Sequence, residues 1–357
     1  MPSKPRRQNP RGLASRSQRG SRAGARDPIP WLLEENNPSV RYLALTDLLG
    51  KSKDDAQVVA ARRDIMATGP VPRILAKQDQ GGTWDKPDGF YTAKFRGTVW
   101  QLITLAQLQA DGSDPRVQQA CHFILESSQD RESGGFSMHR AIRTGGGRAS
   151  EVIPCLTGNL TWSLLRFGCL DHPAVVRAIR WITSYQRFDD GIDSPPRGWP
   201  YDRWEMCWGR HSCHMGVVKA LRALAEIPPS LRSMDVRRSL DLGVEYILRH
   251  HVYKRSHDLT RTAKPSWLRF CFPLMYRTDV LEILLLLTDL GCRDPRMQAA
   301  MDIVVNKQRP DGRFSLDSAP NGRHLVNIEA KGKPSKWITL RALTVMRRWG
   351  PSVHPTG

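Results

Sequence analysis

The chain has 357 residues, of which 40% are hydrophobic and 25% are charged, a composition typical of a globular protein with a large core. Its longest apolar run, residues 280–290, is interrupted by Glu282 and Asp289, so no segment has the roughly 18 apolar residues that a membrane-spanning helix needs. The formal net charge of +19 raises nucleic acid as a partner, but the basic residues are divided between the N-terminus and scattered helical positions.

Residues 1–27 contain seven arginines and one lysine against one aspartate, with almost no large apolar residue. Such a segment cannot form a core, so we predict a disordered basic tail with weak, salt-sensitive attraction to anionic polymers or membrane surfaces. No helix-turn-helix, zinc-finger or stacking motif indicates sequence-specific nucleic-acid binding. No signal peptide is recognised, and the cysteines occur with histidines rather than as a disulfide framework, so we expect a cytoplasmic protein that contacts membrane surfaces through the tail.

A short motif recurs along the chain. Its copies are QDQGGTW at 78–84, QDRESGGF at 129–136, QRFDDG at 186–191 and QRPDGRF at 308–314. A degraded copy is expected near Val252. An interval of about sixty residues accommodates two helices and a long loop in each repeat.

Two sets of helices follow from the sequence between these copies. One set starts with Asp-Pro or Asp-His-Pro after a glycine, at 112–116, 168–173 and 291–296, where Asp is the N-cap and Pro begins the first turn. The second set is apolar around most of its circumference, as in helices that are buried on several sides. Its members are 40–49, 98–109, 156–167, 215–225, 280–290 and 337–349.

These two sets predict an all-α fold over residues 28–357. We expect an α/α toroid, a closed barrel of about six inner helices with an outer helical ring. The glutamine-containing loops should gather at one rim. Residues 27–37 should pack over the last unpaired inner helix.

The motif at 78–84 and its weaker copies resemble the repeat of the terpenoid cyclase and protein prenyltransferase superfamily, which includes squalene and hopene cyclases and is also known as the prenyltransferase and squalene oxidase repeat. The resemblance covers residues 30–350. It implies an α-α toroid whose central cavity holds an isoprenoid, with an acid or a zinc ion starting carbocation or thioether chemistry. The chain departs from both patterns: residues 189–193 (DDGID) lack the Asp-x-Asp-Asp order, and Cys155 is preceded two residues earlier by Ile153 instead of aspartate.

The densest group of metal-ligand residues is at 207–214 (CWGRHSCH). Cys155 and Cys213 each lie three residues before a glycine of an inner helix, so we expect them at equivalent heights on neighbouring helices. With His211 or His214 they could hold zinc, which favours thiolate and imidazole. The alternatives are that these are small buried side chains at helix starts, or that Cys213 is a catalytic thiol with a lowered pKa.

Asp189 and Asp190 are candidates for a catalytic acid, because adjacent carboxyl groups can share a raised pKa. The alternative is a solvated turn. A carbohydrate-active barrel would need two such carboxylates in a cavity, and the sequence offers little for it. Asp279 and Glu282 have the spacing of a helix cap.

Four residues are candidates for ligand contact. They are Trp100, Trp162, Trp208 and Arg210. Aromatic faces can stabilise a carbocation, and a guanidinium can bind diphosphate. Core packing and surface solvation are the alternatives for each.

The leading hypothesis is therefore a terpenoid cyclase or prenyltransferase-like enzyme that acts on an isoprenoid or other hydrophobic ligand in a central cavity, with a Cys/His zinc site at the rim. The alternative is a non-catalytic toroid with structural zinc, whose basic tail recruits an anionic partner. One architecture hosts many functions, so the site must decide between them.

Overall fold

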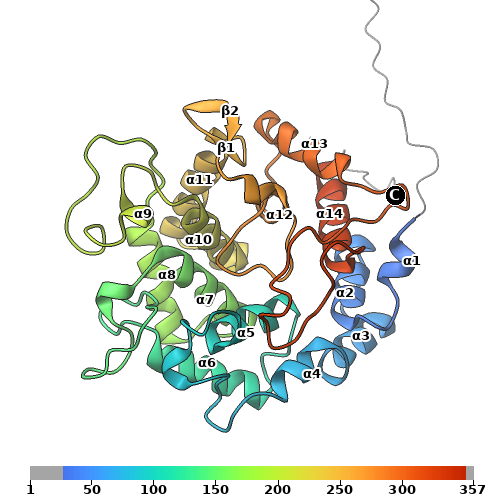
Figure 1. Ribbon diagram of the computed structural model, residues 1–357, viewed down its shortest axis with the longest axis horizontal. Helices are drawn as coiled ribbons and strands as arrows, with labels where there is room; N and C mark the ends of the chain where they lie inside the picture. The colour runs from blue at the N-terminus through green and yellow to red at the C-terminus, as the bar shows by residue number, and fades with distance from the viewer. Residues whose placement is uncertain (1–26, 351–357) are drawn as a thin grey trace, which may run out of the picture.

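The computed structural model describes residues 27–350, which form two concentric rings of helices (Figure 1). The inner ring consists of α2 (Pro38–Leu43) with its π-helical continuation η1 (Ala44–Leu48), α5 (Thr98–Gln107), α7 (Pro154–Arg166), α10 (His214–Glu226), α12 (Val280–Asp289) and α14 (Lys336–Trp349). The outer ring consists of α3 (Ala56–Ala67), α4 (Pro70–Leu75), α6 (Pro115–Ser127), α8 (Pro173–Tyr185), α11 (Met234–Arg249) and α13 (Gln298–Asn306). The predicted all-α toroid is confirmed.

The inner helices are neighbours in chain order around the ring. Each one from α5 onward packs on the next, and α14 packs on α2 and η1. The ring closes where the Ser39 hydroxyl of α2 donates a hydrogen bond to the Leu108 carbonyl oxygen at the end of α5, at 2.7 Å. Within residues 27–350 no helix has the length and apolarity needed to cross a bilayer.

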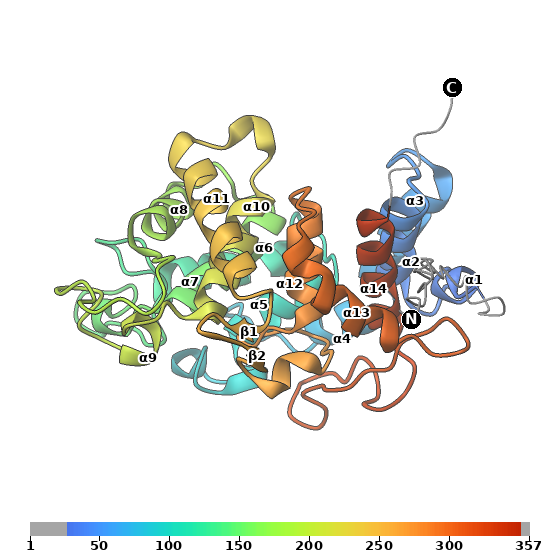
Figure 2. The same ribbon diagram turned by 90° about the horizontal axis from the view of Figure 1, so that it is seen from above.

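The connections that lead into the inner helices lie on one face of the ring. Figure 2 shows there the short helix α9 (Glu205–Trp208), the hairpin of β1 (Lys254–Arg255) and β2 (Asp258–Thr262), and the long loop before α14. The hairpin follows Val252, where the degraded motif copy was expected. This face is the predicted rim.

The segment before α2 packs against the start of α14, as predicted. The Lys336 ammonium donates to Glu34 at 2.8 Å and to the side-chain oxygen of Asn36 at 2.6 Å. Trp31, in α1 (Ile29–Leu32), lies under the Arg313 guanidinium at 4.2 Å from its ring centroid. The predicted tail lies almost entirely outside the described residues, so its disorder stays a prediction.

The glutamine of the motif ties a rim loop to the following outer helix. The Gln78 side-chain amide donates to the Arg116 carbonyl oxygen in the first turn of α6 at 2.9 Å. The Gln129 amide donates to the Ala174 carbonyl oxygen in the first turn of α8 at 2.7 Å. These two copies therefore join one repeat to the next, whereas Gln186 and Gln308 donate within their own loops, to the Arg187 and Gly312 carbonyl oxygens.

The aromatic residue of the motif ties the same loop to the following inner helix. The backbone N–H of this residue donates to a threonine hydroxyl in the first turn of α5, α7 or α14. The pairs are Trp84 with Thr98 (3.2 Å), Phe136 with Thr157 (3.0 Å) and Phe314 with Thr339 (2.9 Å). These threonines are fully buried, so each hydroxyl satisfies an N–H that water cannot reach.

We predict that Thr157→Val lowers the free energy of unfolding by about 1–3 kcal/mol, because it leaves the buried Phe136 N–H without an acceptor. Thr161→Val is the matched control on the same helix, since Thr161 is equally buried and its hydroxyl has no partner. This control should be neutral or stabilising. Urea unfolding followed by circular dichroism measures both, and equal losses in the two variants would contradict the assigned role of the motif.

Candidate ligand cavity and rim pocket

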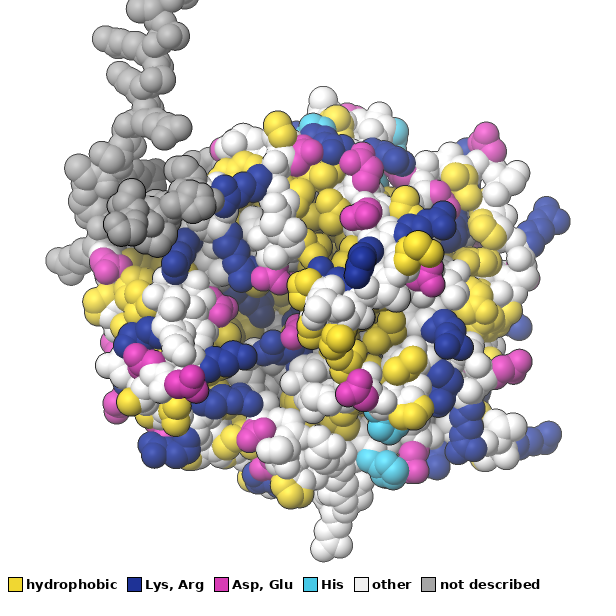
Figure 3. All heavy atoms as spheres, turned by 180° about the vertical axis from the view of Figure 1, so that it is seen from behind, with side chains coloured by type: hydrophobic (Ala, Val, Ile, Leu, Met, Phe, Trp, Pro, Cys, Tyr) yellow, Lys and Arg dark blue, Asp and Glu magenta, His cyan; other side chains and the backbone are white. Residues whose placement is uncertain are grey.

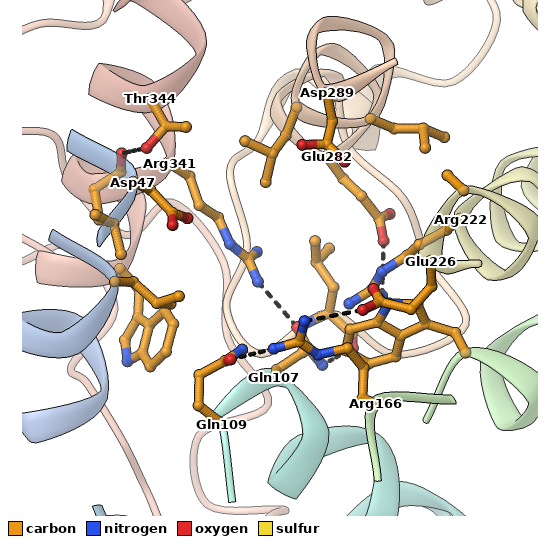
Figure 4. A pocket seen from close by; sticks show the side chains of 18 of the residues that line it. Asp47, Gln107, Gln109, Arg166, Arg222, Glu226, Glu282, Asp289, Arg341 and Thr344 are labelled. Atoms are coloured by element: carbon orange, nitrogen blue, oxygen red, sulfur yellow. Dashed lines mark hydrogen bonds and ion pairs between the residues drawn. The ribbon is translucent and has the colours of Figure 1, made fainter. Parts of the chain in front are cut away.

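A cavity of about 210 Å³ lies in the middle of the ring (Figure 4). All parts of the inner ring contribute to its wall, for example through Asp47, Gln107, Trp162, Arg222, Glu282 and Arg341. Its outermost residues, such as Glu226, Asp289 and Arg348, lie at the C-terminal ends of inner helices, away from the rim. Figure 3 shows acidic and basic side chains mixed on the face opposite to that of Figure 1, around a hollow near the centre.

Residues 270–278, here called the hub segment, fill the middle of the ring beside this cavity. The Gln107 side chain of α5 accepts from the Leu274 N–H at 2.9 Å and donates to the Leu274 carbonyl oxygen at 2.5 Å. Asn159 of α7 donates to the Met275 carbonyl oxygen at 3.2 Å. Phe272 stacks on Trp337 of α14 with centroids 4.1 Å apart. Three inner helices thus hold the hub segment in place as one wall of the cavity.

A buried carboxylate lies among cations at the deep end of the cavity. The Lys219 ammonium is fully buried and lies 2.7 Å from both carboxylate oxygens of Glu282, while Arg222 Nη1 lies 3.1 Å from Glu282 Oε1. Burial opposes the ionisation of Glu282, but Lys219 and Arg222 outweigh it and lower its pKa. Burial also lowers the pKa of Lys219, and Glu282 offsets part of that effect. The cluster links α10 to α12 through charge.

Trp162 is one aromatic wall of the cavity. The Arg222 guanidinium lies over its ring at 3.4 Å from the centroid, which is cation–π geometry. The indole N–H donates to Glu226 at 3.1 Å, and Arg166 pairs with the same carboxylate at 2.9 Å. The ring is therefore fixed in orientation by charged neighbours from α7 and α10.

Arg341 differs from the other arginines of the cavity because none of the described carboxylates pairs with it. Its Nη2 donates to Gln107 at 3.2 Å, and its guanidinium lies 4.8 Å from the Phe272 ring centroid. Burial lowers its pKa. Asp279, the carboxylate with the largest influence on it, has its two oxygens bonded to the Cys271 and Glu282 N–H groups. Arg341 is thus a positive charge without a direct counter-ion.

The four predicted ligand contacts fall in different environments. Trp162 lines the cavity. Trp100 and Trp208 are each 1% exposed and belong to the core, where Trp208 packs against Trp181 and Tyr201. Arg210 is exposed and pairs with Asp193 at 2.9 Å on the rim loop. Trp100, Trp208 and Arg210 therefore do not line the central cavity, and a role for them in ligand contact stays a prediction.

A second pocket, here called the rim pocket, lies at the start of α10 beside the β1–β2 hairpin and has a volume of about 280 Å³. It collects several predicted site residues. Asp190, His211, Cys213 and His214 line it, together with Tyr246, His250, Lys264 and Trp267. The sequence therefore located a real concentration of polar side chains at the rim.

The two candidate acids have separate partners and do not share a proton. Arg187 pairs with both carboxylate oxygens of Asp189, at 2.5 and 2.9 Å. Asp190 lies 2.6 Å from His211 Nδ1 and accepts a hydrogen bond from the Ser256 hydroxyl. Burial alone would raise the pKa of Asp190, but the contacts with Ser256 and His211, and the charge of His250, lower it overall. The pKa of Asp190 is therefore lowered where a raised value was expected, and the role of the two residues as catalytic acids stays a prediction.

The two histidines proposed for zinc contact other side chains. His211 is directed to Asp190, and the His214 ring lies between Tyr246, His250 and Trp267, with 4.5 Å between its centroid and that of Trp267. Burial lowers the pKa of His214 to about 3, so this ring is neutral.

Cys155 and Cys213 do lie at the adjoining starts of α7 and α10, where burial first and Cys213 second raise the pKa of Cys155 to about 12. Yet within residues 27–350 no three His, Cys, Asp or Glu side chains are arranged to hold a metal ion. Zinc stays a prediction that elemental analysis of the purified protein can test.

Sequence reasoning missed the charged residues inside the inner helices. Lys219 and Arg222 are spaced three apart on an otherwise apolar helix, which places both on one face and could have signalled a buried ion cluster. Asp279 does cap α12 by accepting from the Glu282 N–H at 2.8 Å, as predicted. The Glu282 side chain, however, forms an ion pair with Lys219. The capping interpretation did not predict this ion pair.

Fold and cavity together define the class of this protein as an α/α toroid with a charged central cavity. No family model matches the chain, and no curated protein matches its sequence. Among solved structures, it is similar to a protein from Actinoplanes at 14% identity, covering 88% of this chain and 90% of that one, with a TM-score of 0.40.

Two structures of type II terpene cyclase MstE from Scytonema are similar at 16% identity. A variant in complex with its substrate, geranylgeranyl dihydroxybenzoate, has a TM-score of 0.36 and covers 87% of this chain and 85% of that one. A variant with its product, merosterolic acid A, has a TM-score of 0.39 and covers 88% and 86%.

We predict that Glu282→Gln destabilises the protein by about 3–5 kcal/mol, because it leaves Lys219 and Arg222 buried beside a neutral amide. Glu226→Gln is the matched control at the more exposed Arg166 pair and should cost less than about 1 kcal/mol. Chemical denaturation at pH 7 measures both changes in the free energy of unfolding. Similar losses in the two variants would contradict the view that Glu282 compensates two buried cations.

We also predict that Glu282→Gln changes the pH dependence of stability. The folded-state pKa of Glu282 is lowered, so its stabilisation is present above the ordinary glutamate value and is lost as the pH falls through the folded-state pKa. Glu282→Gln should therefore lose less stability than the wild type on acidification. Unfolding midpoints measured across acidic pH test this, and parallel curves for the two proteins would refute it.

Proposed function

We propose that this toroid binds an amphiphilic ligand, an isoprenoid or a similarly apolar chain that carries an anionic group, in its central cavity. The observation that carries the proposal is Arg341, a largely buried guanidinium on the cavity wall whose hydrogen-bond partner is an amide. Of the four arginines that line the cavity, Arg166, Arg222 and Arg348 each form a salt bridge with a lining carboxylate, and Arg341 forms none with the described carboxylates. A bound anion would supply the missing counter-ion.

The rest of the cavity wall suits an apolar chain. Leu274, Leu285, Leu286 and Leu340 line it together with Trp162 and Trp337. Its volume of about 210 Å³ is below the roughly 300 Å³ at which pockets for drug-sized ligands begin. We therefore place the anionic group and the first part of the chain inside the cavity, with the remainder along its mouth beside Leu43 and Ala225.

Binding is proposed ahead of catalysis. The repeat resembles that of terpenoid cyclases and prenyltransferases, and an enzyme of that type would use this cavity for its isoprenoid. Catalysis by proton donation would need a carboxyl group that is free to protonate the ligand. Three of the four carboxylates that line the cavity, Glu226, Glu282 and Asp289, are ion-paired there, which supports a binding role. The fourth, Asp47, is exposed to solvent.

Calorimetry with farnesyl diphosphate and uncharged farnesol tests this function. We expect farnesyl diphosphate to bind more tightly, and Arg341→Met to weaken its binding at least tenfold, which is about 1.4 kcal/mol, with little effect on farnesol. Arg210→Met is the matched control, since Arg210 pairs with Asp193 outside the cavity. Equal affinity for the two probes, or unchanged binding by Arg341→Met, would overturn the proposal.

A further inference from the structure

Exposed hydrophobic side chains gather on two of the rim connections. Ile142 is 89% exposed and Met206 is 84% exposed, the two highest values among the large hydrophobic residues that the structure describes. Trp199 and Trp204 are 37% and 38% exposed. These four side chains are here called the edge patch. Figures 1 and 2 show α9, which carries Met206, and the loops beside it at the outer edge of the ring.

The two connections are held against each other. The Trp199 indole N–H donates to the Ala149 carbonyl oxygen at 3.0 Å, and the Trp204 indole N–H donates to the Ser150 carbonyl oxygen at 3.2 Å. Because the one donor of each indole is used inside the protein, the part of each ring that faces solvent is apolar carbon. Met206 follows Trp204 by two residues. Two tryptophans and a methionine are thus fixed beside the first connection.

Ile142 lies in an ordered turn of that first connection. The Gly145 N–H donates to the Ala141 carbonyl oxygen at 2.9 Å, and the Ala141 N–H donates to the Gly146 carbonyl oxygen at 2.8 Å. Gly145 and Gly146 have φ values of +68° and +69°, in the left-handed region that favours glycine. Four residues separate Gly145 from Ala149, which is at most about 14 Å of chain. The turn therefore presents Ile142 to solvent close to the two tryptophans.

Unpaired positive charge surrounds Ile142. Residues 139–150 contain three arginines and no aspartate or glutamate. Arg140, Arg143 and Arg148 are all exposed, and none of the described carboxylates pairs with them. The turn thus carries an apolar side chain between cations that have no counter-ion in the protein.

The second connection is balanced in charge. Residues 192–210 contain three arginines and three acidic residues. The excess positive charge of this edge is therefore that of the first connection, and the second contributes mainly apolar surface.

This combination of side chains fits the surface of an anionic bilayer. Tryptophan is enriched at the depth of lipid headgroups, aliphatic side chains gain free energy at the boundary with the acyl chains, and basic residues are attracted to anionic headgroups. Nucleic acid fits the patch less well, because Ile142 and Met206 have no group that bonds a phosphate. Charge and apolarity together favour lipid.

We propose that the edge patch docks this protein on anionic lipid bilayers as a peripheral protein. Ile142 and Met206 enter the boundary between headgroups and acyl chains. Trp199 and Trp204 lie at headgroup depth, and the three arginines beside Ile142 contact lipid phosphates. The contact is made by two surface loops, so it depends neither on the central cavity and its proposed ligand nor on the predicted N-terminal tail.

Co-sedimentation of the full chain with phosphatidylcholine vesicles that contain phosphatidylserine tests the proposal. We expect Ile142→Asp to weaken binding at least about tenfold, because it replaces an inserting side chain by a charge that anionic headgroups repel. Met234→Asp is the matched control, since Met234 is 81% exposed at the start of α11, on the face opposite to the rim. This control adds the same charge and should bind like the wild type. Residues 1–26 are present in every variant, so their own attraction to lipid is the same in all.

Tryptophan fluorescence provides a second readout that needs no destabilising change. Phosphatidylcholine brominated near the headgroup, mixed with phosphatidylserine, should quench part of the emission of the wild type. The double variant Trp199→Phe, Trp204→Phe should lose this quenching, because the buried Trp100 and Trp208 do not reach the bilayer. Circular dichroism checks that each variant is folded.

Several results would overturn the proposal. They are equal binding by Ile142→Asp and Met234→Asp, equal binding to vesicles with and without phosphatidylserine, or sedimentation with no quenching of the wild type. Tighter binding to polyuridylate than to the vesicles would assign the patch to nucleic acid instead. A dimer of the wild type that Ile142→Asp dissociates would assign it to a second copy of the chain.

Discussion

The Glu282 carboxylate is the charge around which the centre of this toroid is organised. It lies on α12 and compensates both Lys219 and Arg222 of α10, so two neighbouring inner helices are joined by charge where most of the ring is joined by apolar contact. Taking such charges out of water is expensive, and a well-packed apolar replacement is often at least as stable. The cluster is therefore better explained by the polarity it gives the cavity than by any gain in stability.

The ion pairs of Glu282 also affect Arg341. Because Glu282 is already shared by two cations, it is not available to Arg341 of α14, which instead bonds to the Gln107 amide. The same Gln107 oxygen accepts from Leu274, so the guanidinium, the amide and the hub segment form one connected unit. A ligand that reaches Arg341 would meet a guanidinium held by the Gln107 amide and the Phe272 ring.

Much of the architecture could be predicted from the sequence, because its signals are local. Asp114 and Asp279 cap α6 and α12 as their spacing indicates, and the motif copies fall at the rim. The charged centre could not be predicted in the same way. Lys219 and Glu282 are 63 residues apart, and the sequence does not specify the distance between their side chains until the ring is assembled. Asp190 illustrates the same limit, since its partners His211 and Ser256 come from two other segments.

The hub segment also has a consequence for biosynthesis. The side chains of Gln107 and Asn159 find their partners on residues 167 and 116 positions later in the chain. While the ribosome is still making the second half, these amides face the interior of an incomplete ring with no backbone to bond. The early repeats can form helices as they emerge, but native burial of their inner faces must await Leu274 and Met275. The first three repeats can therefore become compact only after Leu274 and Met275 have left the ribosome.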